Sequence, residues 1–194
     1  MKKALLDALK RHPVFTARDI ASISGKSREY AYLAAYRMAR AGEIRKIEKG
    51  KYTAQGDPFS VASAICWPSY ISSWAALHYY GLTEQLPFTL HVITTRKRKR
   101  KSVSFGNAKI EFITCRRGAF GGFGKTRYGG SEIFIAEKEK AIIDALAFGK
   151  MSVGEAAEII VRNKRKLSMR RLFFHARNFR GIAKKIRGAL RRVN

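Results

Sequence analysis

The sequence predicts an α+β fold, with helices at both ends of the chain and a small, mostly antiparallel sheet between them. Apolar residues recur at helical spacing near both ends, and short alternating runs rich in β-branched residues fill the middle. Glycine or proline separates most of these runs. With 194 residues and 46% apolar side chains, the chain is long enough to bury one core or two smaller ones.

The N-terminal residues predict three short helices. A stripe of leucines predicts the first helix over residues 2–11. Thr16 and Asp19 have the spacing of a capping box for a second helix, which Gly25 ends. Ser27 is placed to cap a third helix, which stops at Gly42.

The third helix has two different faces. Small apolar side chains lie on one side, where they allow close packing: Ala31, Ala34, Ala35, Met38 and Ala41. The other side is polar, basic and aromatic, which is also typical of an ordinary solvated helix. As the second helix of a helix-turn-helix, it would present the following residues to the major groove of DNA: Lys26, Ser27, Arg28, Tyr32, Tyr36 and Arg40.

A basic hairpin follows this helix. Residues 43–47 and 51–53 alternate like strands, and Gly50 supplies the turn between them. Helix, turn, helix and hairpin in this order predict a winged helix-turn-helix. The wing would contact the DNA backbone or minor groove through Arg45, Lys46, Lys49 and Lys51.

Turn-forming residues over 55–58 predict a domain boundary, with a DNA-binding domain over 1–55 and an α+β domain over 56–194. The second domain is expected to contain helices and strands in turn, with a break at 68–70 and a flexible glycine-aromatic loop near 119–130. The expected helices are 59–65, 71–80, 137–148, 153–161 and one or two basic helices from Ser168, and the expected strands are 90–94, 103–105, 110–114 and 133–135.

The chain has a formal net charge of +26, which makes a polyanion the expected partner, and nucleic acid the first choice among polyanions. Residues 162–194 contain thirteen basic residues and no acid. They lie on nucleic acid, face an acidic partner, or form a solvated surface. A second basic run supplies candidates for phosphate or partner contacts, with a solvated loop as the alternative: Arg96, Lys97, Arg98, Lys99, Arg100 and Lys101.

No residue pattern predicts catalysis, a metal site or a cofactor. Residues 119–126 nearly spell a nucleotide-binding P-loop, but Ala119 replaces its first glycine and no helix is expected to follow. No Asp-x-Lys or Glu-x-Lys nuclease signature occurs. Cys66 and Cys115 are too far apart for paired metal ligands and are expected to be reduced thiols in the core. No segment predicts a signal peptide or a membrane span, so we expect a cytoplasmic protein.

Several segments together resemble the AbiEi family of antitoxins and transcriptional regulators from abortive-infection systems. In the first domain the resemblance rests on Phe15–Asp19, Tyr36–Ile44 and Lys49–Tyr52. In the second domain it rests on Tyr70–Leu82 and Ile135–Asp144. The set covers most of the chain, although the basic tail and the run at 96–101 depart from the usual pattern.

The resemblance implies a winged domain that binds operator DNA and represses transcription, and a second domain that counters a nucleotidyltransferase-like toxin. It implies no catalytic residues. Double-stranded DNA is the expected partner, in a homodimer if the operator has two-fold symmetry. Two alternatives stay open. One is an antitoxin that acts mainly through protein contacts, and the other is an RNA-binding or nucleic-acid-processing accessory factor without a toxin.

Overall fold

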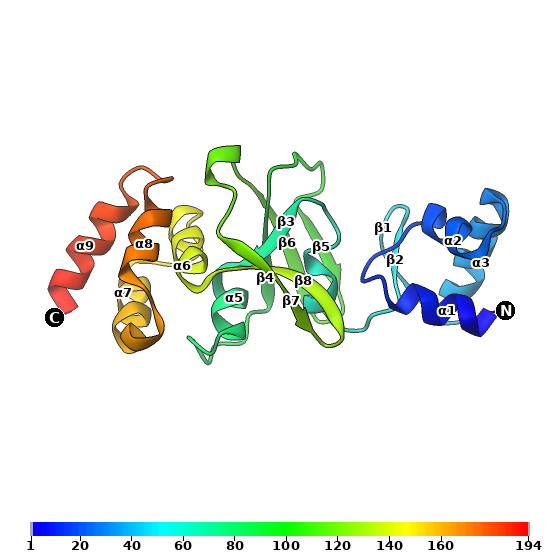
Figure 1. Ribbon diagram of the computed structural model, residues 1–194, viewed down its shortest axis with the longest axis horizontal. Coiled ribbons are helices and arrows are strands. Elements are labelled where there is room, and N and C mark those ends of the chain that lie inside the picture. The colour runs from blue at the N-terminus through cyan, green and yellow to red at the C-terminus, as the bar shows by residue number, and fades with distance from the viewer. Residues whose placement is uncertain (1, 194) are drawn as a thin grey trace.

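The computed structural model of the chain describes residues 2–193. It is elongated, with three small helices and a hairpin at one end, a mixed sheet in the middle and a group of helices at the other end (Figure 1). The two chain ends lie at opposite ends of the molecule. The expected α+β fold class is confirmed.

The N-terminal segment has its own hydrophobic cluster, to which Leu9, Phe15, Ile20, Ala35 and Met38 contribute side chains that are at most 2% exposed. Burial of these side chains holds the three short helices together, since isolated helices of this length are marginal in water. The elements of the segment are α1 (Lys2–Lys10), α2 (Ala17–Ser24), α3 (Arg28–Arg40), β1 (Arg45–Glu48) and β2 (Lys51–Thr53).

Local signals begin and end these helices where the sequence predicts. Thr16 and Asp19 form the expected capping box at the start of α2, and Gly25 ends that helix in the left-handed conformation with φ 62°. The Ser27 side chain accepts a hydrogen bond from the Tyr30 amide at the start of α3. One detail of the expected packing face is wrong. Ala41 follows the last residue of α3 and is exposed.

A six-stranded mixed sheet forms the middle of the molecule in the order β5-β6-β4-β3-β8-β7. The β3–β8 and β4–β6 pairings are parallel and the other three are antiparallel. The sheet is therefore larger than expected. Its strands are β3 (Ser69–Ser72), β4 (Thr89–Thr94), β5 (Ser102–Phe105), β6 (Ala108–Thr114), β7 (Phe123–Tyr128) and β8 (Ser131–Ala136).

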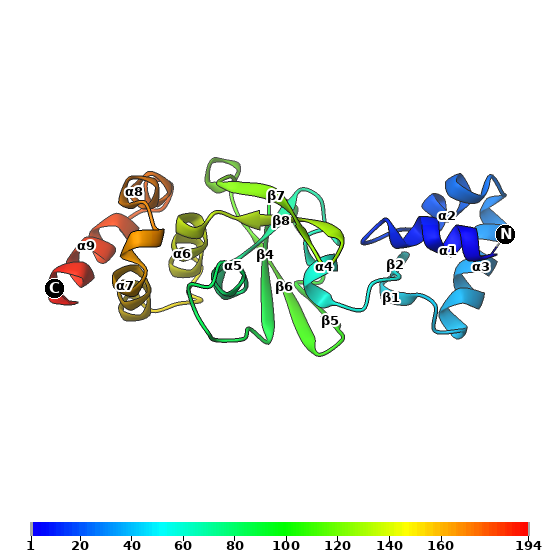
Figure 2. The same ribbon diagram turned by 60° about the horizontal axis from the view of Figure 1, so that its bottom comes forward.

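Helices pack on the sheet and on one another to complete a second, larger hydrophobic cluster. Beyond the sheet, α6 to α9 form the end of the molecule that lies farthest from α1 (Figure 2). The helical elements are α4 (Pro58–Ala62), α5 (Ser73–Tyr79), η1 (Arg117–Ala119), α6 (Lys138–Ala147), α7 (Val153–Arg162), η2 (Lys164–Lys166), α8 (Met169–Ala176) and α9 (Ile182–Val193).

Two strands lie where the sequence predicted none. The expected break at 68–70 runs into β3, whose four residues are all buried and pair with β4, while Ile71 also pairs with Ile135 of β8. The expected flexible loop near 119–130 contains β7, which pairs with β8 over its whole length. Both strands depend on partners that are distant in the sequence or on the far side of a turn, so local pattern did not reveal them.

Candidate nucleic-acid interface

The exposed face of α3 carries the residues expected to meet DNA. Tyr32 and Tyr36 are 53% and 58% exposed, and Lys26, Arg28 and Arg40 are exposed as well. The opposite face is buried in the N-terminal cluster. Ser27 is exposed at the start of the helix, although its hydroxyl also serves as the cap.

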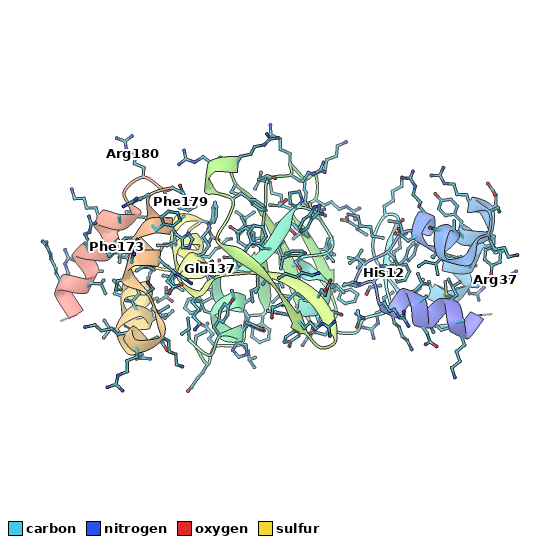
Figure 3. The ribbon with its side chains drawn as sticks, in the orientation of Figure 1. His12, Arg37, Glu137, Phe173, Phe179 and Arg180 are labelled. Carbon is cyan, nitrogen blue, oxygen red and sulfur yellow. The ribbon has the colours of Figure 1, made fainter. Side chains whose placement is uncertain are left out.

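These basic groups form no close ion pair in the described residues, although hydrogen bonds and, to a smaller extent, the charge of Arg28 lower the pKa of the neighbouring Glu29. In the part of the chain that the structure describes, Lys26, Arg28 and Arg40 take part in no hydrogen bond or ion pair through their side chains. The Arg40 guanidinium lies 5.9 Å from the centre of the Tyr36 ring, which holds the two side chains beside each other. The helix therefore presents free cations next to exposed aromatic rings, at the outer end of the molecule where Arg37 is labelled (Figure 3).

The hairpin β1–β2 is fixed to this helical segment by an extra backbone pairing. The Phe15 and Tyr52 backbones exchange two hydrogen bonds of 2.9 Å and 2.8 Å, and their rings stack with centroids 6.4 Å apart. Phe15 comes just before α2 and its side chain is 1% exposed. The position of the hairpin relative to α2 and α3 is thus set by backbone bonds and by the buried cluster.

Three of the four expected wing residues face solvent. Arg45, Lys46 and Lys49 are exposed, as phosphate contacts require. Lys51 is different: its ammonium group donates to the Glu48 carboxylate at 2.8 Å and also to the Ile65 carbonyl oxygen. Lys51 therefore links the hairpin to the sheet side of the molecule, and we leave it out of the candidate interface.

Arg98 is the point where the basic run at 96–101 meets the hairpin. Its guanidinium donates to the Glu48 carboxylate at 2.6 Å and lies 4.0 Å from the centre of the Phe112 ring. The Arg98 and Glu48 side chains are each 13% exposed. Burial by itself would raise the pKa of Glu48, but the hydrogen bonds from Lys51 and Arg98 hold this pKa below its ordinary value.

Arg98 therefore has a partner within the fold, while its neighbours carry free charges. The Arg96 guanidinium donates to the Trp67 carbonyl oxygen at 3.1 Å but stays exposed. The rest of the run is exposed without a side-chain partner in the described residues, namely Lys97, Lys99, Arg100 and Lys101. The Arg98–Glu48 ion pair places this loop beside the wing, so the two basic segments adjoin although 50 residues separate them in the sequence.

A buried polar cluster at the sheet was not anticipated from the sequence. The Asp144 carboxylate accepts hydrogen bonds from Ser72 at 2.8 Å, from Tyr70 at 3.1 Å and from the Lys140 ammonium. All four residues are at most 1% exposed, so Asp144 does not lie on the surface as acids near a helix start commonly do. No reactant reaches such a site from solvent. We therefore assign the cluster to stability.

Within residues 2–193 no group of three or more His, Cys, Asp and Glu side chains is placed to hold a metal ion. Cys66 and Cys115 are buried and free, as expected. Over the same range, every helix is too short or too polar to cross a bilayer.

Comparison with known proteins finds a similarity for the N-terminal segment. Residues 3–55 match the family model AbiEi_4, whose description is "Transcriptional regulator, AbiEi antitoxin". The matched stretch runs from α1 to just beyond β2 and contains every candidate residue of α3 and the hairpin. No curated protein matches the chain. The description names a regulator and an antitoxin, and the resemblance inferred from the sequence is confirmed as a similarity to this family over residues 3–55.

Proposed function

We propose that the chain is a DNA-binding transcriptional regulator, in which α1 to β2 act as a winged helix-turn-helix. The observation that carries the proposal is α3, with one face buried and the other bearing exposed, unpaired cations beside Tyr32 and Tyr36. In this arrangement the first residues of α3 reach base edges and flanking cations meet phosphates. The residues proposed for the major groove are Lys26, Ser27, Arg28, Tyr32, Tyr36 and Arg40.

The proposed backbone contacts extend beyond the wing. Arg45, Lys46 and Lys49 are exposed on the hairpin, and the ion pair between Glu48 and Arg98 brings the loop at 96–101 next to them. Each cation that neutralises a phosphate releases counterions, so a surface that combines both segments binds more tightly at low salt than the wing alone. The three N-terminal helices have a hydrophobic cluster of their own, which supports our proposed division into domains 1–55 and 56–194, with Ile47 of the hairpin packing into the sheet cluster at the junction.

Selection from a random duplex DNA pool at about 150 mM salt tests this function, followed by mobility-shift titration of the selected site. We expect the R28E/R40E variant to lose binding, because two unpaired cations of α3 become anions in the groove. The matched control is K184E/K185E, which changes the net charge equally on exposed residues of α9 at the other end of the molecule. Inverted repeats among the selected sites are expected if two copies bind together.

Salt dependence provides a second measurement on the same site. A regulator that makes six to ten phosphate contacts loses about a thousandfold or more in affinity between 50 and 200 mM salt. Unchanged binding of the selected site by R28E/R40E would contradict the assignment of α3 as the reading helix. Equal losses in R28E/R40E and K184E/K185E would reduce the result to an effect of net charge.

The family description also supports a proposed antitoxin role. We assign this role to residues 56–194, which would bind a nucleotidyltransferase-like toxin through their basic surface. Coexpression of the full chain with a toxin encoded beside its gene tests the role, since growth should be restored by the wild type. Growth restored equally by residues 1–55 would contradict the assignment to the second part.

A further inference from the structure

The basic tail forms an uncompensated cationic surface at the end of the molecule opposite α3. All thirteen basic residues of 162–194 are exposed. They lie at the end of α7, on α8 and α9, and in the segments that connect these helices (Figure 1). Within the described part of the chain only Arg162 of this set forms an ion pair, at 3.8 Å from Glu158, and both side chains of that pair are more than half exposed. Such a density of like charge is costly unless an anion lies on it.

The middle of this surface is helix α8, which has one buried and one exposed face. Leu172, His175 and Ala176 are at most 5% exposed and face the core. His175 Nε2 lies 3.2 Å from Glu137 Oε2, which ties α8 to the start of α6. Gly122 leaves room for the imidazole, because a Cβ atom there would stand 2.5 Å from His175 Cε1. The outward face of α8 is therefore held in place from behind.

The outward face of α8 combines an exposed aromatic ring with arginines. Phe174 is 60% exposed, although a phenylalanine on a helix with a buried face would normally be turned inward. It lines a hollow of about 480 Å³ whose other residues are Ser168, Arg170, Arg171 and Arg177. An exposed ring that shares one hollow with three arginines matches the combination by which proteins hold single-stranded nucleic acid, namely base stacking on an aromatic side chain and phosphates on cations.

We propose that α8 and the cations around it bind single-stranded nucleic acid, with a base stacked on Phe174 and phosphates at Arg170, Arg171 and Arg177. A duplex does not account for Phe174, because paired and stacked bases present no free ring face. A membrane surface does not account for it either. The apolar side of α9, the most basic amphipathic helix of this surface, is already buried against the protein through Ile182 and Ile186, so α9 has no free apolar face to insert.

Fluorescence anisotropy with a labelled, unstructured RNA of about 12 nucleotides, and with the DNA strand of the same sequence, tests this site in the full chain. We expect F174L to bind about tenfold more weakly, since loss of one stacked base costs on that order. The matched control is F88L, because Phe88 is 81% exposed but has no cation among its sequence neighbours. F88L should bind as the wild type does.

Two further variants separate this site from the proposed duplex interface. R170Q/R177Q should lower the slope of log K against log salt by about 1.4, because each phosphate contact of a single strand contributes about 0.7. R28E/R40E should bind the single strands as the wild type does, even though it is expected to lose the selected duplex. Failure of one function therefore leaves the other measurable.

Several outcomes would overturn the proposal. Wild-type affinity of F174L for both single strands would remove the stacking role. Weaker binding by R170Q/R177Q with no effect of F174L would indicate a purely electrostatic surface, as for an acidic protein or a duplex backbone. The proposal would also be overturned if the wild type did not bind single strands at about 150 mM salt.

Discussion

Replacement of Lys140 by methionine should strongly destabilise the part of the molecule that contains the sheet. Lys140 is 1% exposed and Asp144 is fully buried. Methionine fills much of the space of the lysine stem but supplies no charge. It would leave the Asp144 carboxylate with hydrogen bonds from Ser72 and Tyr70 only. Removal of one partner from a buried ion pair costs about 3–5 kcal/mol, because the remaining charge stays desolvated.

The expected change is large enough to measure by thermal unfolding. For a protein of about this size, 1 kcal/mol shifts the Tm by roughly 2–4 °C, so K140M should lower the Tm by about 6–20 °C. Tryptophan fluorescence reports on the correct part of the chain. Trp67 and Trp74 both lie in the part that contains the sheet, and the Trp74 indole donates to the Lys150 carbonyl oxygen at 2.7 Å.

A surface pair provides the matched control. The Glu158 and Arg162 side chains are 61% and 79% exposed, so E158Q should change the free energy of unfolding by less than about 1 kcal/mol. The double variant K140M/D144L should be more stable than K140M, because it also removes the buried Asp144 carboxylate that K140M leaves without its cation. A Tm of K140M within about 2 °C of the wild type would refute the assignment of this pair to stability.

Two further predictions concern ionisation. Hydrogen bonds from Lys51 and Arg98 lower the pKa of Glu48 in the folded chain. The ionised Glu48 therefore stabilises the fold above its ordinary pKa of 4.5. This stabilisation is lost as the pH falls through the lower pKa of the folded chain. Chemical denaturation between about pH 3 and pH 6 should show a smaller acid-dependent loss of stability in E48Q than in the wild type, and equal losses would contradict the ion pair. Burial raises the pKa of Cys115 to about 11, so only about one thiol in a thousand is ionised at pH 8. Cys115 of the native protein should therefore react slowly with a disulfide reagent, which absorbance can follow in the C66S variant. Rapid modification of Cys115 in native C66S would contradict a buried thiol.

The N-terminal elements were predictable because short local signals bound each of them. Thr16 with Asp19, Gly25 and Ser27 lie where the chain must begin or end a helix, and each acts on residues within four positions of itself. The exposed face of α3 follows from the same periodicity. For this reason the candidate residues of that helix could be named before the structure was known.

The sequence was uninformative where the partner of a residue is distant. Arg98 read as one of six equivalent cations, but Glu48 pairs with it across 50 positions. The serines of β3 did not resemble a central strand, and their burial depends on β4, β8 and Asp144. The sequence offered no signal for the exposure of Phe174, since it depends on which face of α8 packs against α6.

The placement of the two chain ends at opposite ends of the molecule (Figure 1) has a consequence for ligand occupancy. Ligands on α3 and on α8 do not compete for space, so one molecule can hold both at once. Tethering by a single protein raises the effective concentration of each ligand near the other without any contact between them. If both proposals hold, the protein is a bridge that keeps a single strand close to the operator, and its length sets their separation.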